Sequence, residues 1–226
     1  MSSGLAIVEG YTEHEFVKFV LAPWLGERGV FLTAPVLGKA GHKGGIREYE
    51  RTKPELIEYC KRSDVFITTM FDFFRMPLSW PGRAQANSAN HDSKARIVEV
   101  AIHEDICESM GDSFNSSRFT PYVQMYEFEA LLFSQPEIIA DVTGEIKLAP
   151  QLAEIRQAFK TPEHINDAPT TAPSKRIESL VSTYKKRTDG RIAAEKIGMD
   201  RMLAECPHFA GWVERLLATN STEPAN

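Results

Sequence analysis

IVEGYTE, residues 7–13, joins the end of an apolar β-strand to the start of a helix. Its first two residues complete the strand and its glycine allows a turn. Thr12 and Glu15 then have the spacing of a capping box, which predicts that the helix begins here. Apolar residues recur at helical spacing from 16 to 25 and predict one buried helix face. This strand–turn–helix order is typical of the first unit of an α/β fold.

The sequence up to about residue 135 repeats this alternation. The 65–71 segment, VFITTMF, is the clearest strand, because it is a continuous apolar and β-branched run of the kind found in buried parallel strands. The alternation predicts a mainly parallel sheet flanked by helices. Residues 1–135 would form this α/β domain, and residues 136–226 a helical C-terminal extension packed on it. Further strands are expected at 30–37 and 120–125, helices at 47–62 and 93–110, and a long loop at 75–93.

Composition and charge narrow the class of protein. Hydrophobic residues make up 42% of the 226 residues, yet no apolar run reaches the roughly 18 residues that a membrane helix needs. The three cysteines show neither metal-ligand nor disulfide spacing, so we expect a cytoplasmic protein. The net charge of −5 is not that of a strongly basic nucleic-acid binder, although residues 174–201 contain eight Lys or Arg and four acids. That segment is either a phosphate-binding stripe or an ordinary solvated helix face.

Three acids follow predicted strands: Glu9, Asp72 and Glu127. The carboxyl ends of parallel strands lie along one edge of a sheet, so these acids are expected to converge, with Glu13 projecting from the first helical turn. Grouped carboxylates suit Mg²⁺ or Mn²⁺, which promote phosphoryl chemistry. Simpler roles remain open, since Glu9 would also favour a helix N-terminus and Asp72 would also cap a turn. Glu129 differs from Glu127 by two positions, and we expect Glu127 to be the inward one of the pair.

Several other residues are candidates for contacts with a nucleic acid. Lys43 lies in a glycine-rich basic loop that lacks the spacing of a phosphate-binding P-loop. Lys175 and Arg176 would reach back to the acidic edge and bind a scissile phosphate. Trp80 would either stack on a base or anchor the long loop to the core. The six histidines show no ligand-pair spacing; those at 42 and 91 are expected in loops near the acids.

Six segments together resemble one family over nearly the whole chain: EGYTE (9–13), FDFFRMP (71–77), WPG (80–82), EFEALLF (127–133), PSKRI (173–177) and CPHFAGW (206–212). They are similar to a Toprim-related bacterial family of unknown function, domain of unknown function 4276. Toprim domains are metal-binding modules of topoisomerases, primases and OLD-type nucleases.

The resemblance implies a role for each acid. Glu9 takes the place of the glutamate after the first Toprim strand, and Asp72 that of the leading aspartate of an Asp-x-Asp pair. Phe74 stands at the second aspartate, so another metal ligand would come from elsewhere, such as Glu127. Glu13 would then be a secondary acid or general base, and Lys175 would stabilise transition-state charge.

Two functions follow from the resemblance. The first is a Mg²⁺- or Mn²⁺-dependent nuclease that cuts DNA or RNA as an anti-phage effector, with an ATPase of the SMC or AAA type as partner. The second is a degenerate Toprim scaffold that acts as a regulatory or binding subunit of such an ATPase. The choice between DNA and RNA stays open, as does the formation of a homo-oligomer.

Overall fold

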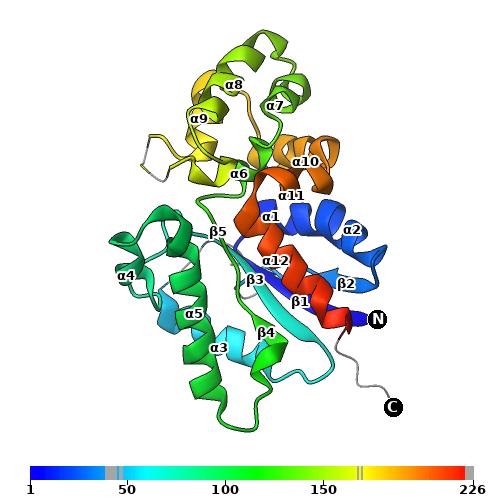
Figure 1. Cartoon of the computed structure of the whole chain (residues 1–226), viewed down its shortest axis with the longest axis vertical. Coiled ribbons are helices and arrows are strands. Elements are labelled where there is room, and N and C mark those ends of the chain that lie inside the picture. The colour runs from blue at the N-terminus through cyan, green and yellow to red at the C-terminus, as the bar shows by residue number, and fades with distance from the viewer. Residues whose placement is uncertain (39–44, 46–47, 167, 169, 222–226) are drawn as a thin grey trace.

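The computed structural model describes residues 1–38, 45, 48–166, 168 and 170–221 (Figure 1). A parallel β-sheet lies at its centre between two layers of helices, and a group of C-terminal helices extends from one end of the sheet. The predicted α/β class, a mainly parallel sheet flanked by helices, is confirmed.

The sheet has five strands in the order β2-β1-β3-β4, with β5 also paired to β3, and all pairs are parallel. The register places Ile7 beside Thr69 and Phe71 beside Val123. The predicted strand at 120–125 is two short strands on either side of Pro121, which has no N–H to donate to a ladder. The strands are β1 (Ser2–Val8), β2 (Val30–Thr33), β3 (Phe66–Asp72), β4 (Phe119–Thr120) and β5 (Val123–Gln124).

Alternate side chains of β1 enter two separate hydrophobic clusters, one on each face of the sheet. Ala6 and Val8 pack in the first cluster, and Leu5 and Ile7 in the second. The first face is covered by α1 (Tyr11–Phe16), the π-helical turn η1 (Val17–Leu21) and α2 (Ala22–Gly26); the second by α3 (Tyr49–Cys60), α4 (Arg83–Asn87) and α5 (His91–Met110), with the 3₁₀ turn η2 (Ser116–Arg118) before β4.

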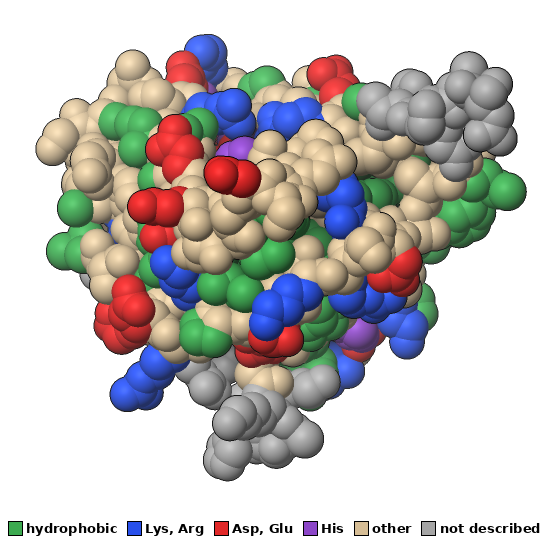
Figure 2. Space-filling view, turned by 90° about the horizontal axis from the view of Figure 1, so that it is seen from below, with side chains coloured by type: hydrophobic (Ala, Val, Ile, Leu, Met, Phe, Trp, Pro, Cys, Tyr) green, Lys and Arg blue, Asp and Glu red, His purple; other side chains and the backbone are tan. Residues whose placement is uncertain are grey.

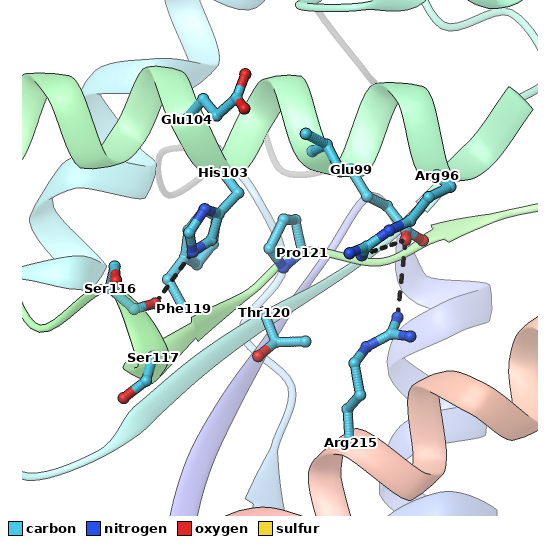
Figure 3. A pocket seen from close by; sticks show the side chains of 11 residues that line it. Arg96, Glu99, His103, Glu104, Ser116, Ser117, Phe119, Thr120, Pro121 and Arg215 are labelled. Carbon is cyan, nitrogen blue, oxygen red and sulfur yellow. Dashed lines mark hydrogen bonds and ion pairs between the residues drawn. The ribbon is translucent and has the colours of Figure 1, made fainter. Parts of the chain in front are cut away.

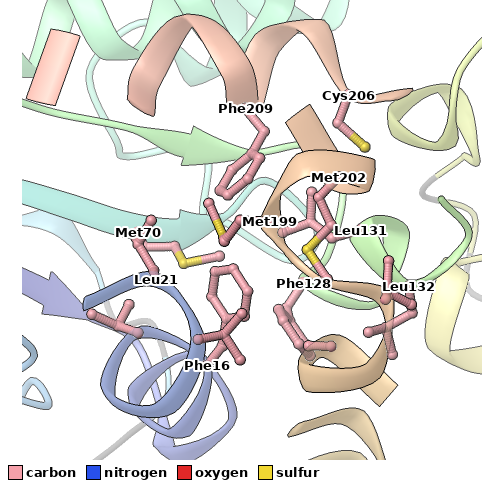
Figure 4. Packing of buried hydrophobic residues seen from close by; sticks show 14 of the residues in the cluster. Phe16, Leu21, Met70, Phe128, Leu131, Leu132, Met199, Met202, Cys206 and Phe209 are labelled. Atoms are coloured by element: carbon pink, nitrogen blue, oxygen red, sulfur yellow. The ribbon is translucent and has the colours of Figure 1, made fainter. Parts of the chain in front are cut away.

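The C-terminal helices join the first cluster. Figure 4 shows Phe16 and Leu21 from the first helices packed with Phe128, Met199 and Phe209 from later ones. These helices are α6 (Glu129–Leu132), α7 (Pro136–Thr143), η3 (Ile146–Leu148), α8 (Ala149–Gln157), η4 (Pro162–His164), α9 (Pro173–Leu180), α10 (Lys186–Ile197), α11 (Met199–Glu205), α12 (Pro207–Ala218) and η5 (Thr219–Ser221).

Polar contacts also hold α12 against the sheet and against the η4 turn. Trp212 donates from Nε1 to Thr68 Oγ1 at 2.8 Å, and its ring stacks on Tyr122 with centroids 4.2 Å apart. The buried Glu163 carboxylate accepts the N–H groups of His208 and Phe209, at 3.0 and 2.9 Å, in the first turn of α12. Because one hydrophobic cluster crosses residue 135, the domain boundary placed there stays a prediction.

The predicted capping box is wrong. Helix α1 begins at Tyr11 with Gly10 as its N-cap, so Thr12 lies inside the first turn, and no side chain caps the helix. The backbone supplies the first bond instead, since His14 N–H donates to the Gly10 carbonyl at 3.1 Å. Glu15 turns away from the helix start and pairs with Arg187 at 2.8 Å.

The predicted loop at 75–93 is also only partly a loop. It contains the short helix α4, and α5 begins at His91, two residues before the predicted start of the next helix. Asn90 caps α5, because its Oδ1 accepts the Ser93 N–H at 3.1 Å.

Charged side chains are mixed over the surface. On the face in Figure 2, acidic and basic groups alternate, and the described residues form no broad patch of one sign there. Within residues 174–201, six of the eight basic side chains form ion pairs, for example Arg191 with Glu195 at 2.5 Å and Lys196 with Asp141 at 2.7 Å. This segment is therefore mainly a charge-paired helix surface. In the described part of the chain, no helix has both the length and the apolar character needed to cross a membrane.

Candidate metal and catalytic site

The parallel sheet brings its strand-end acids to one edge. Glu9 directly follows β1, Asp72 is the last residue of β3, and Glu127 comes three residues after β5. Because β3 pairs in parallel with both β1 and β5, the chain delivers these three acids to the same end of the sheet.

Two further acids join them from helix starts. Glu13 lies in α1 and is only 6% exposed, and Glu129 begins α6 and is 1% exposed. The glycine at position 10 leaves room for Glu13, since a Cβ there would lie 3.1 Å from Glu13 Oε2. We call Glu9, Glu13, Asp72, Glu127 and Glu129 the acidic cluster.

The five carboxylates act on one another. Burial raises the pKa of Asp72 well above its usual range, and Glu13, Glu9, Glu127 and Glu129 raise it further. Burial and the Glu9 charge raise the pKa of Glu13 to about 7. The pKa of Glu129 also rises to about 7, chiefly through burial, with Lys186 opposing the shift. Asp72 is thus the electrostatic centre of the cluster.

One lysine partly balances this charge. Lys186 lies at the start of α10, and its Nζ is 3.4 Å from Oε1 of Glu127 and 3.4 Å from Oε1 of Glu129. Burial alone would lower the pKa of Lys186, but the carboxylates of Glu129, Glu127 and Asp72 outweigh this and raise it. In the described structure one ammonium faces five carboxylic acids, so the ammonium can neutralise only part of the negative charge that these acids can carry.

Backbone N–H groups orient two of the acids. Phe128 N–H donates to Asp72 Oδ1 at 3.1 Å, and Ser174 N–H, in the first turn of α9, donates to Glu127 Oε2 at 2.9 Å. Glu9, Asp72 and Lys186 keep part of their surface exposed, whereas Glu13, Glu127 and Glu129 are buried. A substrate would therefore approach from the side of the partly exposed residues.

The structure corrects two expectations about neighbouring residues. Glu127 and Glu129 both face inward onto Lys186, so the expectation of a single inward residue is wrong. Lys175 pairs with Glu178 at 2.6 Å, and Arg176 donates to the Thr171 carbonyl at 2.8 Å; neither side chain contacts the acidic cluster in the described structure. The PSKRI segment does reach the site, but through the Ser174 backbone.

The lysine beside the acids is Lys186, not Lys175 as expected from the sequence. The sequence offered only a weak signal for it, its position in the basic segment 174–201. Lys43 lies outside the described residues, as does His42.

Phe74 and Trp80 have structural positions. Phe74 N–H donates to the Tyr126 carbonyl at 2.8 Å, and its ring packs against the second hydrophobic cluster with the Arg75 guanidinium 5.0 Å from its centroid. Trp80 is 2% exposed and packs on the rings of Tyr49 and Phe71. Trp80 therefore anchors its loop to the core, which excludes the alternative of a base-stacking surface residue.

The acids of the cluster do not form a compact group of three ligand atoms in the described structure. Among the described residues, the group of three with ligand atoms within 4.8 Å of one another is His91, Asp92 and His164, not a set of acids from the cluster. Mg²⁺ needs only one or two carboxylates and keeps several waters, so a compact group of three acids is not a requirement for its binding.

A cavity of about 340 Å³ lies elsewhere, between α5, β4 and α12 (Figure 3). Glu99 is buried at its edge, pairs with His208 at 2.9 Å and Arg215 at 3.7 Å, and accepts the Val123 N–H at 3.0 Å. These contacts join α5 to β5 and α12. They do not include the acids of the cluster, so we regard this cavity as separate from the candidate site.

The acidic cluster and its supporting helices fall within one family match. The model of the family described as "Domain of unknown function (DUF4276)" matches residues 8–217. The chain belongs to the DUF4276 family. The match begins at the last residue of β1 and ends within α12, so this DUF4276 protein carries every acid of the cluster inside the shared segment. Searches of curated proteins and of solved structures gave no match.

The stability of the metal-free protein should fall as the pH rises from 5 to 8. Glu13 and Glu129 hold protons up to about pH 7 when folded but lose them near their ordinary pKa of 4.5 when unfolded. Between these values the folded state binds more protons, so higher pH favours unfolding. Between pH 5 and 8, the unfolding free energy of Glu13→Gln should fall by on the order of 2 kcal/mol less than that of the wild type. Urea unfolding in EDTA at pH 5, 6, 7 and 8 measures this difference. Parallel curves for the variant and the wild type would contradict the burial of a protonated Glu13.

Proposed function

We propose that this protein is a Mg²⁺- or Mn²⁺-dependent nuclease with a Toprim-like site. The observation that carries the proposal is the convergence of Glu9, Asp72 and Glu127 from three strand ends, with Glu13 and Glu129 beside them. Five carboxylates at one edge of a parallel sheet, with raised pKa values at Asp72, Glu13 and Glu129 and one paired ammonium among the described residues, have no evident role in stabilising the fold.

The donor set fits a hard divalent cation. Glu9, Asp72 and Glu127 would hold it, because all three offer carboxylate oxygens and two of them are partly exposed. A bound ion of this kind polarises a phosphoryl oxygen and activates water. Glu13 is suited to move a proton, since a pKa of about 7 lets the carboxyl group act as acid or base near neutral pH.

The proposal extends to partner and location. We place the protein in the cytoplasm, in keeping with free cysteines at 60, 107 and 206, as an anti-phage effector that acts with an ATPase of the SMC or AAA type. These parts rest on the resemblance to Toprim proteins rather than on contacts in the structure. The proposal allows either DNA or RNA as the substrate.

The test is metal-dependent cleavage. Purified protein should nick supercoiled plasmid or cut transfer RNA with Mn²⁺ or Mg²⁺, and EDTA should stop it. The double variant Glu9→Gln with Asp72→Asn should lose this activity while its circular dichroism stays that of the wild type. Cleavage that survives in the double variant would point to a contaminating nuclease and remove the support for the proposal.

A second candidate function is a metal-free scaffold for the ATPase partner. Lys186 favours it, because its ammonium already neutralises part of the charge of Glu127 and Glu129 without any ion. Phe74, which offers no ligand atom, favours it as well. A wild-type protein that stays inert with its partner present, and whose melting temperature does not respond to Mn²⁺, would select this function.

A further inference from the structure

A second group of ligand side chains lies apart from the acidic cluster. His91 and Asp92 begin α5, and His164 ends the 3₁₀ turn η4. One ligand atom from each of the three lies within 4.8 Å of the other two. The two histidines are 73 positions apart in the sequence, so the fold alone brings them together.

The hydrogen bonds hold both imidazole rings in position for a ligand role. His91 Nε2 lies 2.7 Å from the carbonyl oxygen of Glu163. A carbonyl only accepts, so Nε2 carries the proton and the lone pair of the neutral ring is on Nδ1. This Nδ1 atom is buried and lies 3.5 Å from Asp92 Oδ1, which is long for a hydrogen bond.

His164 is held in the same manner. Its Nδ1 lies 2.8 Å from Thr161 Oγ1, and its Nε2 lies 3.1 Å from the same Asp92 Oδ1 atom. Because a carboxylate only accepts, Nε2–H donates to Asp92 and Nδ1 accepts from the Thr161 hydroxyl. A metal ion would replace the proton on Nε2, and the Thr161 oxygen, which can also accept, would then hold a proton on Nδ1. Histidines that bind metals usually have the other nitrogen fixed by a carbonyl or a similar group, and both rings meet this condition.

The surroundings leave room for an ion and its waters. The three residues line a cavity of about 310 Å³ together with Lys160, Thr161, Glu163 and His208. The Asp92 carboxylate is 65% exposed and its other oxygen lies 3.5 Å from the 73% exposed Lys160 ammonium, so the competing ion pair is a weak surface contact. The rings stack with centroids 3.8 Å apart at 19°, and binding requires them to tilt apart by rotation about their side-chain bonds.

We propose that His91, Asp92 and His164 bind one Zn²⁺ ion. Two imidazole nitrogens and one carboxylate oxygen form a donor set for Zn²⁺ rather than for Mg²⁺, which prefers oxygen, and water completes the tetrahedron. The ion joins the start of α5 to the η4 turn of the C-terminal helices and so stabilises the packing between them. The site is independent of the nuclease proposal, because it shares no ligand with the acidic cluster.

The test is zinc binding by the full chain after EDTA treatment and buffer exchange. Calorimetry and elemental analysis should give one Zn²⁺ per chain, and Zn²⁺ should raise the melting temperature. The double variant His91→Asn with His164→Asn should lose the bound zinc. Asp92→Asn, at an exposed position where folding is not at risk, should weaken binding at least about 10-fold.

Two controls locate the ion. His103→Asn with Cys107→Ser removes a histidine–thiol pair elsewhere in the fold, in which Cys107 Sγ lies 3.7 Å from both ring nitrogens of His103, and should leave zinc binding unchanged. Glu9→Gln with Asp72→Asn should also leave it unchanged, which separates this site from the acidic cluster. Zinc retained by the His91/His164 variant, lost in either control, or undetectable in the wild type at micromolar concentration would overturn the proposal.

Discussion

Asp72→Asn is expected to remove the response to Mn²⁺ and to lower metal-dependent cleavage by about 10³-fold or more, while making the metal-free protein more stable above pH 7. The two effects have opposite signs because Asp72 is at the centre of five mutually repelling carboxylates. Asparagine keeps the oxygen that accepts the Phe128 N–H at 3.1 Å, so the backbone after β5 stays in place. Only the charge is lost.

The gain in unfolding free energy should be about 1–2 kcal/mol at pH 8 in EDTA, the usual size of a stabilising substitution. Urea unfolding of the wild type and the variant measures it, and thermal unfolding with and without Mn²⁺ measures the metal response. Asp64→Asn is the matched control, since Asp64 is exposed, pairs with Arg62 at 2.6 Å and belongs to no cluster of acids. It should change stability by less than about 0.5 kcal/mol. A destabilised Asp72→Asn would mean that Asp72 has a structural rather than a functional role.

The same positions show how far the sequence predicts the site. Glu9 and Asp72 could be placed together because the apolar runs before them are clear strands and parallel topology fixes where such strands end. Glu127 was placed by the same reasoning, although its strand is split by Pro121. The sheet and its acidic edge thus follow from periodicity and chain connectivity, which are local properties of the sequence.

The contacts between side chains from distant segments could not be predicted from the sequence. Lys186 lies 59 positions from Glu127, and nothing in the sequence selects it over Lys175 or Lys185. Glu129 turned inward because α6 begins there, and the direction of a side chain at such a junction depends on a boundary that sequence patterns place poorly. The Thr12 capping signal failed for a related reason, since the glycine turn starts the helix one residue before Thr12.

The two proposed functions differ in what they require of Lys186. In a scaffold, its ammonium is the permanent counterion of Glu127 and Glu129. In a nuclease, its ammonium would balance these two carboxylates beside a bound divalent ion and would be available to a substrate phosphate. Its 39% exposed side chain allows the second role, because the ammonium can move toward solvent without being buried unpaired.

Lys186→Met should therefore destabilise the metal-free protein by about 3 kcal/mol at pH 8, at the low end of the range for breaking a buried ion pair because Lys186 is partly exposed. Lowering the pH to 5.5 should recover much of this loss, since Glu13 and Glu129 then take up protons. Urea unfolding at the two pH values measures both effects. Lys185→Met is the control, because Lys185 is exposed and has no contact with the cluster through its side chain.

Metal binding by the same variant separates the two functions. If the cluster is a metal site, Lys186→Met removes a competing cation, so Mn²⁺ should bind more tightly than to the wild type and restore the lost stability. Calorimetric titration with Mn²⁺ and unfolding in its presence give both quantities. A variant that stays unstable in millimolar Mn²⁺ and binds no ion would show that the ammonium is the only cation these carboxylates accept, and the scaffold function would then be the correct one.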